Sequence, residues 1–283
     1  MALTQAQLDE LREIDTPTIL NAIETFGVRP DTLGFTGTNI RYLAPDMGVM
    51  LGYAVTALGD TMSEDAPKSP DGMFQMWEAV DETPNPVVLV IKDFGDDPTH
   101  SVHAGDGMAT LAHVLGADGI VTDAALRDLE GVKGAGIKPF ARGLAPSHAN
   151  NRIIRAQVPV AIDGMDVNPG DLVHGDENGV CTIPMAIADK VAAAANKILE
   201  GEEATRLSYL EPGFNLDDYA KQRGLTRMEP ARGFSAAPVR REAAPRFSWF
   251  EPGGDFVPMS AECPGRMRLD GRRPIACSES RPW

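Results

Sequence analysis

Two short motifs hold the residues best suited to chemistry, and twenty residues separate Asp106 in the first from Arg127 in the second. Gly105-Asp106-Gly107 forms a turn that opens onto apolar residues at helical spacing, and Arg127-Asp128 follows a short buried strand and begins another helix. In a compact α/β domain, such loop ends tend to lie on the same side of the sheet. Helix-start amides, a guanidinium and a carboxylate that converge there could hold a small anion and a hard divalent metal.

Each of these residues also has an ordinary structural explanation. Asp128 would favour the positive end of its own helix, as acidic residues in a first turn often do. Arg127 alone is typical of a surface ion pair, and Asp106 alone is typical of a helix N-cap. The three residues together, at this spacing, favour a functional site over three separate structural roles.

The histidines show no comparable arrangement. His100 and His103 are spaced like a metal pair, but their Asp- and Gly-rich surroundings predict exposed loop residues. His113, on the predicted helix, and His148, after a Gly- and Pro-containing loop, have no evident partner. The histidine pattern therefore predicts no metal site.

Acidic and cysteine residues elsewhere are equally uninformative. The acidic cluster around residues 93–97 lacks the glycine and closing glutamate of a calcium loop, and it predicts a solvated turn. The cysteines are odd in number and lack CxxC spacing, so they indicate neither a disulfide framework nor a zinc site. These three cysteines are Cys181, Cys263 and Cys277.

Helices and buried strands are predicted to alternate through the first half of the chain. Helices are expected at 3–14, 16–27, 73–80 and from 106, and strands at 50–58, 86–94, 120–121 and 137–142, with an exposed loop at 59–71. Residues 156–183 then alternate and break at Gly-containing turns, which predicts hairpins before a long helix from 187 that continues past Gly201. This order indicates an α/β protein of three layers with mixed sheets.

Composition narrows the class of protein. The formal net charge of -15 argues against a nucleic-acid or anionic-membrane partner. The N-terminus reads as a charged amphipathic helix and no run is long enough to span a bilayer, so we expect a cytoplasmic protein. Residues 1–210 are predicted to form the catalytic domain. Residues 211–283 are predicted to be an irregular or partly disordered C-terminal extension, because Pro, Gly and Arg dominate without periodicity.

The sequence resembles the RraA-like family. The resemblance is carried by GADGIVTDAALRDLEGVKGAGIKPFARGLAP, with Asp106 upstream, by DTPTILNAI and by VNPGDLVHGDENGVCTIP, and it spans about residues 10–206. The family includes class II pyruvate aldolases that cleave 4-hydroxy-4-methyl-2-oxoglutarate and 4-carboxy-4-hydroxy-2-oxoadipate. The resemblance implies a three-layer β/β/α swivelling-domain fold, assembled as a homotrimer or homohexamer with sites at subunit interfaces.

The resemblance also implies a role for each residue of the two motifs. Asp128 would bind Mg²⁺ or Mn²⁺, with water filling most of the remaining coordination positions. Arg127 would contact a 2-keto acid and stabilise its enolate. Asp106 would hold or deprotonate an active-site water.

Two further parts of the implied site come from the backbone and from a neighbouring subunit. Gly105, Gly107 and Met108 would bind the substrate, with helix-start amides receiving its carboxylate. Glu203 matches a carboxylate that the family supplies from the terminal helix of an adjacent subunit, and Glu202 is a near competitor for this role.

Three functional hypotheses follow. The first is a divalent-metal-dependent lyase that cleaves a C–C bond of a small 2-keto acid through a pyruvate enolate, by retro-aldol cleavage or oxaloacetate decarboxylation. The second is a non-catalytic, RraA-type regulator that binds a ribonuclease. The third is a methyltransferase, which the sequence disfavours because Gly105 and Gly107 form only GxG and no glycine-rich βα loop is evident. Retention of Asp106, Arg127 and Asp128 together favours the enzyme.

Overall fold

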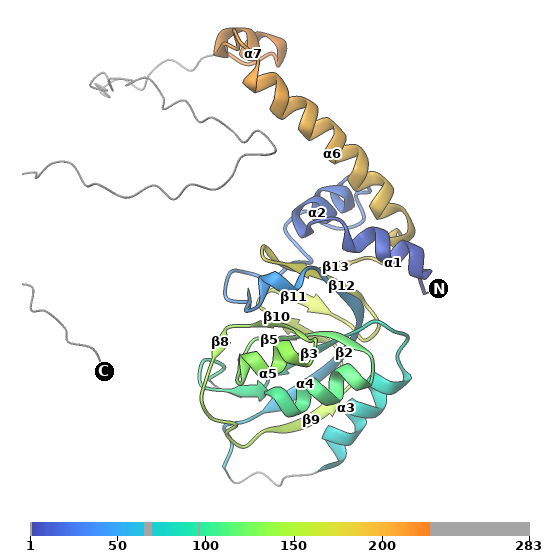
Figure 1. The fold of residues 1–283 in the computed structure, drawn as a ribbon, viewed down its shortest axis with the longest axis vertical. Helices are drawn as coiled ribbons and strands as arrows, with labels where there is room; N and C mark the ends of the chain where they lie inside the picture. The colour runs from blue at the N-terminus through green and yellow to red at the C-terminus, as the bar shows by residue number, and fades with distance from the viewer. Residues whose placement is uncertain (1, 65–69, 96, 227–283) are drawn as a thin grey trace, which may run out of the picture. The chain divides into compact units, whose positions relative to one another are not determined.

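The structure is a computed structural model that describes residues 2–64, 70–95 and 97–226 (Figure 1). Most of the predicted C-terminal extension, residues 227–283, lies outside the described residues. Residues 1–224 form one compact unit, while the predicted domain boundary near residue 210 stays a prediction. Within the described residues, no helix is both long and apolar enough to cross a bilayer.

A mixed sheet forms the centre of this unit, and its middle strands run parallel. The strand order is β1-β7-β5-β3-β2-β12-β13, with β9 paired to β2 beyond the β12 contact. β2, β3, β5 and β7 are parallel neighbours, and β1, β9, β12 and β13 are antiparallel. The strands are β1 (Arg41–Tyr42), β2 (Met50–Asp60), β3 (Val87–Asp93), β5 (Ala117–Thr122), β7 (Lys138–Ala141), β9 (Arg152–Ala156), β12 (Leu172–Asp176) and β13 (Gly179–Ile183).

Helices and a hairpin cover opposite faces of this sheet. Helices α3 (Pro70–Glu82), α4 (Asp106–Val114) and α5 (Leu129–Gly134) pack on one face around residues such as Leu89 and Ile120. The hairpin of β10 (Val160–Ile162) and β11 (Met165–Val167) packs on the other face, against Val88 and Val90. The resulting β/β/α layering confirms the predicted fold class.

A third hydrophobic cluster joins the two termini of the described unit. Helices α1 (Gln5–Arg12), α2 (Thr16–Glu24) and α6 (Ala188–Leu210) pack against β12, β13 and the start of β2. Thr4 forms a capping box at the start of α1, and the Asp15 carboxylate caps α2 by accepting a hydrogen bond from the Thr18 amide. A 3₁₀ turn (Pro45–Met47) and α7 (Leu216–Gln222) complete the helical elements among the described residues.

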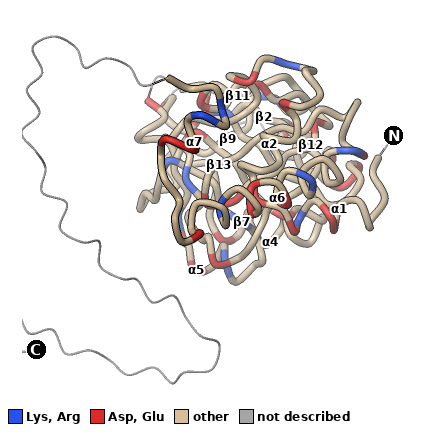
Figure 2. The backbone as a smooth tube through the Cα atoms, turned by 90° about the horizontal axis from the view of Figure 1, so that it is seen from above, with Lys and Arg blue, Asp and Glu red and all other residues tan. Residues whose placement is uncertain are grey.

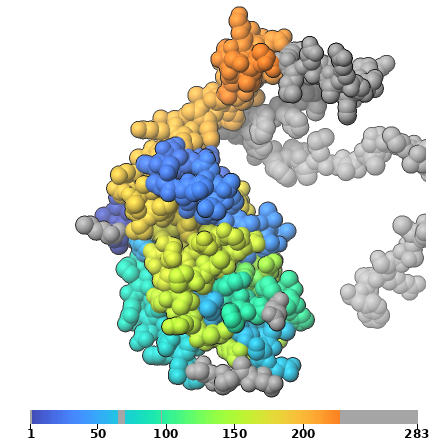
Figure 3. All heavy atoms as spheres, turned by 180° about the vertical axis from the view of Figure 1, so that it is seen from behind, coloured from blue at the N-terminus to red at the C-terminus, as the bar shows by residue number. Residues whose placement is uncertain are grey.

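Helix α6 continues through Gly201, as predicted, but its second half is exposed. From residue 199 to its end almost every residue is exposed, and α6 and α7 extend beyond the sheet and its covering helices (Figures 1 and 3). Leu199, Leu207 and Leu210 are among the exposed apolar side chains. Acidic and basic positions are interspersed along the backbone in the view of Figure 2.

A small second sheet continues the parallel strands beyond their carboxyl ends. β4 (Val102–Ala104), β6 (Ala125–Leu126) and β8 (Gly143–Leu144) pair in parallel, and they follow β3, β5 and β7 along the chain. β4 leads directly into the Gly105-Asp106-Gly107 turn, and β6 leads directly into Arg127-Asp128. The small sheet therefore sets the two motifs side by side.

One boundary of the sequence prediction is wrong, and one predicted helix packs through its small residues. The predicted loop at 59–71 begins too early, because β2 reaches Asp60 and both Asp60 and Thr61 are buried. Helix α4 is present, but it buries Ala109 and Ala112, whereas Leu111 is 40% exposed. Small side chains of α4 therefore face the sheet. Apolar periodicity does not distinguish them from larger apolar residues that face solvent.

The junction between the N-terminal helices and β12 contains a buried histidine. His174 accepts a hydrogen bond at Nδ1 from the Thr16 hydroxyl (3.0 Å) and donates from Nε2 to the Leu11 carbonyl (3.1 Å). Asp176 accepts a bond from the Thr16 amide. Burial lowers the pKa of His174, which outweighs the opposing effect of the Leu11 carbonyl and the nearby carboxylates. The imidazole is therefore neutral in the folded protein.

Candidate active site

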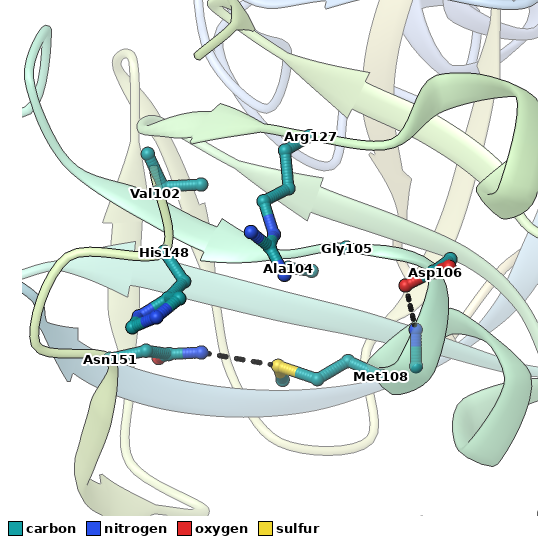
Figure 4. Close-up of a pocket in the computed structure, with 9 residues that line it drawn as sticks. Val102, Ala104, Gly105, Asp106, Met108, Arg127, His148 and Asn151 are labelled. Atoms are coloured by element: carbon teal, nitrogen blue, oxygen red, sulfur yellow. Dashed lines mark hydrogen bonds between the residues drawn. The ribbon is translucent and has the colours of Figure 1, made fainter. Parts of the chain in front are cut away.

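The Gly105-Asp106-Gly107 turn and Arg127 line one small pocket of about 240 Å³ (Figure 4), whereas Asp128 is not among its lining residues. β4 forms its floor, the start of α4 forms one side, Arg127 points in from β6, and the 148–151 segment closes the opposite side. The lining residues are Val102, Ala104, Gly105, Asp106, Gly107, Met108, Arg127, His148 and Asn151.

The start of α4 supplies amides to this pocket. Gly105 is the N-cap and makes no side-chain cap bond, so Asp106 occupies the first helical position and is not the N-cap. The Asp106 carboxylate accepts a hydrogen bond from the Gly107 amide at 2.7 Å. No described residue accepts a bond from the Met108 amide. A ligand carboxylate would therefore meet the Met108 amide first and compete with Asp106 for that of Gly107.

Arg127 and Asp128 lie at the junction of β6 and α5. The Arg127 amide donates to the Ala104 carbonyl at 3.0 Å, which fixes its backbone against β4. Its Nε lies 3.1 Å from Asp128 Oδ2, and the side chains are 34% and 43% exposed. Asp128 precedes α5 in a left-handed conformation (φ 55°) and makes no side-chain cap bond. Its carboxylate is thus held beside Arg127 and does not cap the helix.

Two glycines allow the motifs to approach each other. A methyl group on Gly105 would lie 2.9 Å from Asp128 Oδ2 and 3.0 Å from Arg127 Cγ. A methyl group on Gly131, in α5, would lie 2.6 Å from the Asp106 Cβ. An added methyl group at either place would displace the side chains that it meets, so both glycines allow Asp106, Arg127 and Asp128 to lie close to one another.

Glu203 lies elsewhere in the chain. It is exposed on α6 and forms a two-pronged ion pair with Arg206, 2.7 and 2.8 Å, which lowers the pKa of its carboxyl group. Glu202, its competitor, lies 3.4 Å from the Asn21 amide group. A single chain does not bring either glutamate to the pocket, so the role assigned to a neighbouring subunit stays a prediction.

Two pocket residues were missed by the sequence interpretation. His148 is exposed, and its Nδ1 lies 2.8 Å from the Ala149 carbonyl, while the ring faces the cavity (Figure 4). Asn151 donates from Nδ2 to the His103 carbonyl (3.1 Å) and contacts Met108 Sδ (3.3 Å), and its Oδ1 is buried without a protein partner among the described residues. No local pattern marks either residue, because both reach the pocket through a long loop.

The prediction for His103 and Asp93 is also wrong. Both side chains are fully buried, and His103 Nε2 lies 2.8 Å from Asp93 Oδ1. Asp93 ends the central strand β3 and is no part of a solvated turn. His100 and Asp97 are exposed, as expected. His103 differs from His100 because His103 lies in β4, the buried strand that begins directly after this polar segment.

The donor set fits a hard divalent ion better than a thiophilic one. Asp106 and Asp128 offer carboxylate oxygens, and one oxygen of Asp128 makes no hydrogen bond to a described residue. No group of three or more His, Cys, Asp or Glu in the described part of the chain is arranged to hold a metal. An ion here would keep several waters, which Mg²⁺ tolerates well.

Among the described residues, no cysteine lines this pocket. Cys181 is buried in β13, and burial raises the pKa of its thiol to about 12. A thiol with that pKa is almost entirely protonated near neutral pH and is a poor nucleophile. The chemistry available at the pocket is therefore that of Arg127, the two carboxylates, His148, Asn151 and the helix-start amides.

The fold and the pocket together define a mixed α/β protein in which a helix-start turn and Arg127 line one small cavity, with Asp128 paired to Arg127. A family model described as RraA-like, Aldolase/RraA, matches residues 16–182, and the chain belongs to this family. The resemblance inferred from the sequence is thereby confirmed.

Individual relatives agree with this assignment. The chain is 28% identical over 206 residues, covering 71% of this chain and 89% of the relative, to a protein of Halalkalibacterium halodurans that is provisionally named 4-hydroxy-4-methyl-2-oxoglutarate aldolase. A solved structure from Pseudomonas syringae pv. tomato has a TM-score of 0.59 and 24% identity, covering 78% of this chain and 96% of that one. Streptomyces coelicolor RraAS2, described as an unusual member of the RNase ES inhibitor RraA family, has a TM-score of 0.58 and 22% identity, covering 73% and 98%. The two structures show the shared fold.

Proposed function

We propose that this protein is a divalent-metal-dependent lyase that cleaves a C–C bond of a small 2-keto acid and releases pyruvate. The observation that carries the proposal is the pocket itself. Arg127 and the start of α4, with the Asp106 carboxylate, line one cavity of about 240 Å³, and the Asp128 carboxylate lies 3.1 Å from Arg127 Nε at its edge. The similarity to a provisionally named aldolase along most of both chains supports the same reaction class.

The residues of the pocket suit the charge that this reaction develops. Cleavage beside a 2-keto acid leaves negative charge on the enolate oxygen of pyruvate, and the fixed Arg127 guanidinium stabilises it. The amides at Gly107 and Met108 receive the carboxylate of the keto acid. A divalent ion held by Asp128, Mg²⁺ or Mn²⁺, would supply Lewis-acid stabilisation of the same oxygen.

Proton transfer distinguishes the two reactions that the site could support. Retro-aldol cleavage of a 4-hydroxy-2-keto dicarboxylate requires a base for the 4-hydroxyl, whereas decarboxylation of oxaloacetate does not. Asp106 is exposed at the helix start, where its carboxylate can hold a water beside the substrate. We assign Asp106 to this water and Arg127 to the enolate that both reactions share.

We also propose that the site is completed at an interface between copies of this chain, in a trimer or hexamer. Glu203 lies on the exposed second half of α6, beyond the body of its own subunit. This half carries exposed leucines together with its charges, which suits a helix that packs against another copy. Glu203 would then exchange Arg206 for a partner at the neighbouring site.

The test is a coupled pyruvate-release assay with oxaloacetate and a panel of 4-hydroxy-2-keto acids, each with and without Mg²⁺. We expect metal-dependent release from at least one dicarboxylate. Absence of release from every substrate would contradict the lyase. Inhibition of a ribonuclease E-type enzyme by the same preparation would then favour the non-catalytic alternative.

A further inference from the structure

A buried histidine lies on the far side of the strand that forms the pocket floor. Val102 and Ala104 of β4 line the pocket, and His103 between them points in the opposite direction, because side chains alternate along a strand. Its ring is fully buried and packs against Gly59, where a methyl group would lie 2.3 Å from Cε1. Nothing in the proposed chemistry uses this residue directly.

His103 is bonded to the end of a central strand, β3. Nε2 donates to Asp93 Oδ1 at 2.8 Å, and the other carboxylate oxygen of Asp93 accepts a bond from the Ser101 hydroxyl at 3.1 Å. The Asp93 amide in turn donates to Asp123 Oδ1, at the end of the neighbouring strand β5. Nδ1 has no partner among the described residues, so the polar contact of the ring runs through Nε2 alone.

The backbone around His103 supports three parts of the pocket. Its carbonyl accepts the Asn151 amide hydrogen at 3.1 Å, and the next carbonyl, that of Ala104, accepts the Arg127 amide at 3.0 Å. The residue after that is Gly105, the N-cap of α4. A displacement of β4 would therefore move Asn151, Arg127 and the helix-start amides together.

The ladder of the small sheet is a weak anchor for such a strand. β4 has three residues, pairs in parallel with the two residues of β6, and its register shifts between Val102 and Ala104. So short a ladder offers few hydrogen bonds, and a side-chain bond to the central sheet adds a fixed point.

We propose that His103, held by Asp93, is a positioning residue that sets the place of β4 and thereby the relative positions of Arg127, Asn151 and the α4 amides. The inference depends on the proposed function only for its kinetic readout. The geometric readout below applies whatever reaction the pocket supports.

A pair of substitutions separates this role from simple loss of a side chain. His103→Gln keeps a donor near the position of Nε2, whereas His103→Asn places its donor near Nδ1 and cannot reach Asp93. We expect the backbone amide NMR signals of Gly105, Gly107 and Arg127 to stay in place in the glutamine variant and to shift in the asparagine variant. Unmoved signals in the asparagine variant, or equal shifts in both, would overturn the proposal.

The kinetic readout follows the same pair. His103→Asn should lower kcat/KM for pyruvate release about 10- to 100-fold, because a displacement of the binding groups by about 1 Å is enough to slow a reaction to this extent. His103→Gln should restore most of that loss. Were the wild type inactive, the proposed function would fail and the NMR comparison alone would decide on His103.

The matched control is His174→Asn, which removes the bonds of another buried histidine at the α1–α2 junction. It should lower thermal stability and leave the pocket signals in place. Pocket shifts as large as those of His103→Asn would mean that any loosening moves the site, and would contradict the proposal. If His103→Asn does not fold, Ser101→Ala takes its place, because it removes one hydrogen bond to Asp93. It should shift the amide signals of Gly105, Gly107 and Arg127 to a smaller extent, and unmoved signals would contradict the proposal.

Discussion

Arg127, which we propose stabilises an enolate, is held at two points. Its amide is bonded to the Ala104 carbonyl, and its Nε is paired with Asp128. The guanidinium is planar and carries several donors, and it matches two adjacent oxygens of a keto acid better than an ammonium group does. Fixed donors of this kind are the largest contributors to many enzymatic rates.

Arg127→Lys should therefore lower both oxaloacetate decarboxylation and retro-aldol cleavage by about two orders of magnitude or more, which is typical for loss of an oxyanion donor. Steady-state kinetics with both substrates measure the effect. A lysine variant that keeps most of either activity would remove Arg127 from enolate stabilisation.

Asp106→Asn is the companion variant. It should reduce aldol cleavage more than decarboxylation, since only the former requires removal of a hydroxyl proton. Equal losses would leave Asp106 as an organiser of the Gly107 amide, with which it is already bonded.

At this scale the sequence identifies residues by type but not by burial. Asp106, Arg127 and Asp128 could be singled out because they begin two predicted helices on either side of the predicted buried strand at 120–121. His103 and Asp93 could not be recognised as buried, since their polar sequence surroundings are typical of an exposed loop. Only the structure shows that β4 carries His103 into the interior. Asn151 and His148 carry no local signal, because only the path of the loop after β8 places them.

At the scale of elements, the contact between α4 and α5 controls the position of Asp106. Gly131→Ala would force a methyl group to within 2.6 Å of the Asp106 Cβ, so one helix must shift. We expect aldol activity to fall about tenfold or more through displacement of Asp106.

Gly134→Ala is the matched control in the same helix, because a methyl group there meets nothing within 4 Å. It should leave activity unchanged and stabilise the fold by up to about 1 kcal/mol, the usual difference between alanine and glycine in a helix. Kinetics and thermal unfolding of both variants test the contact. Equal activity in the two would show that the α4–α5 approach does not matter.

Elements with strong periodicity were predictable, and short ones were not. The apolar run of β3, the hairpin turns near Asp163-Gly164 and Asn178-Gly179, and the length of α6 all follow from the sequence. The small sheet of β4, β6 and β8 does not, because strands of two or three residues are too short to show alternation. That sheet is the element that joins the two motifs.

For the molecule as a whole, His174 predicts a dependence of stability on pH. Its folded pKa is lowered by burial, while its unfolded pKa is about 6.5. As the pH falls, the unfolded chain therefore binds a proton at His174 before the folded chain does. The contribution of His174 to the free energy of unfolding is complete above about pH 6.5 and is lost as the pH falls below that value.

Urea unfolding between pH 5 and 7.5 should show a free energy of unfolding that falls toward acid by up to about 1.4 kcal/mol per pH unit from this residue. His174→Gln removes the titrating group and should flatten that slope. The same slope in the variant would place the pH dependence elsewhere.

The assembly is the second property of the whole molecule that can be measured. Light scattering should give a trimer or hexamer, because the exposed half of α6 and its leucines need a partner surface. Glu203→Gln should lower activity without changing the mass, if the carboxylate acts at a neighbouring site. A fully active monomer would exclude Glu203 from the site.

The most direct measurement of the central claim is pyruvate release with the divalent ion removed and restored. In the wild-type protein, excess EDTA should abolish release and added Mg²⁺ or Mn²⁺ should restore it, while thermal unfolding changes little. Asp128→Asn should resemble the chelated protein at every metal concentration, because it lacks the carboxylate assigned to the ion. Full activity of the wild type in excess EDTA, or of Asp128→Asn, would contradict a metal-dependent lyase at this pocket.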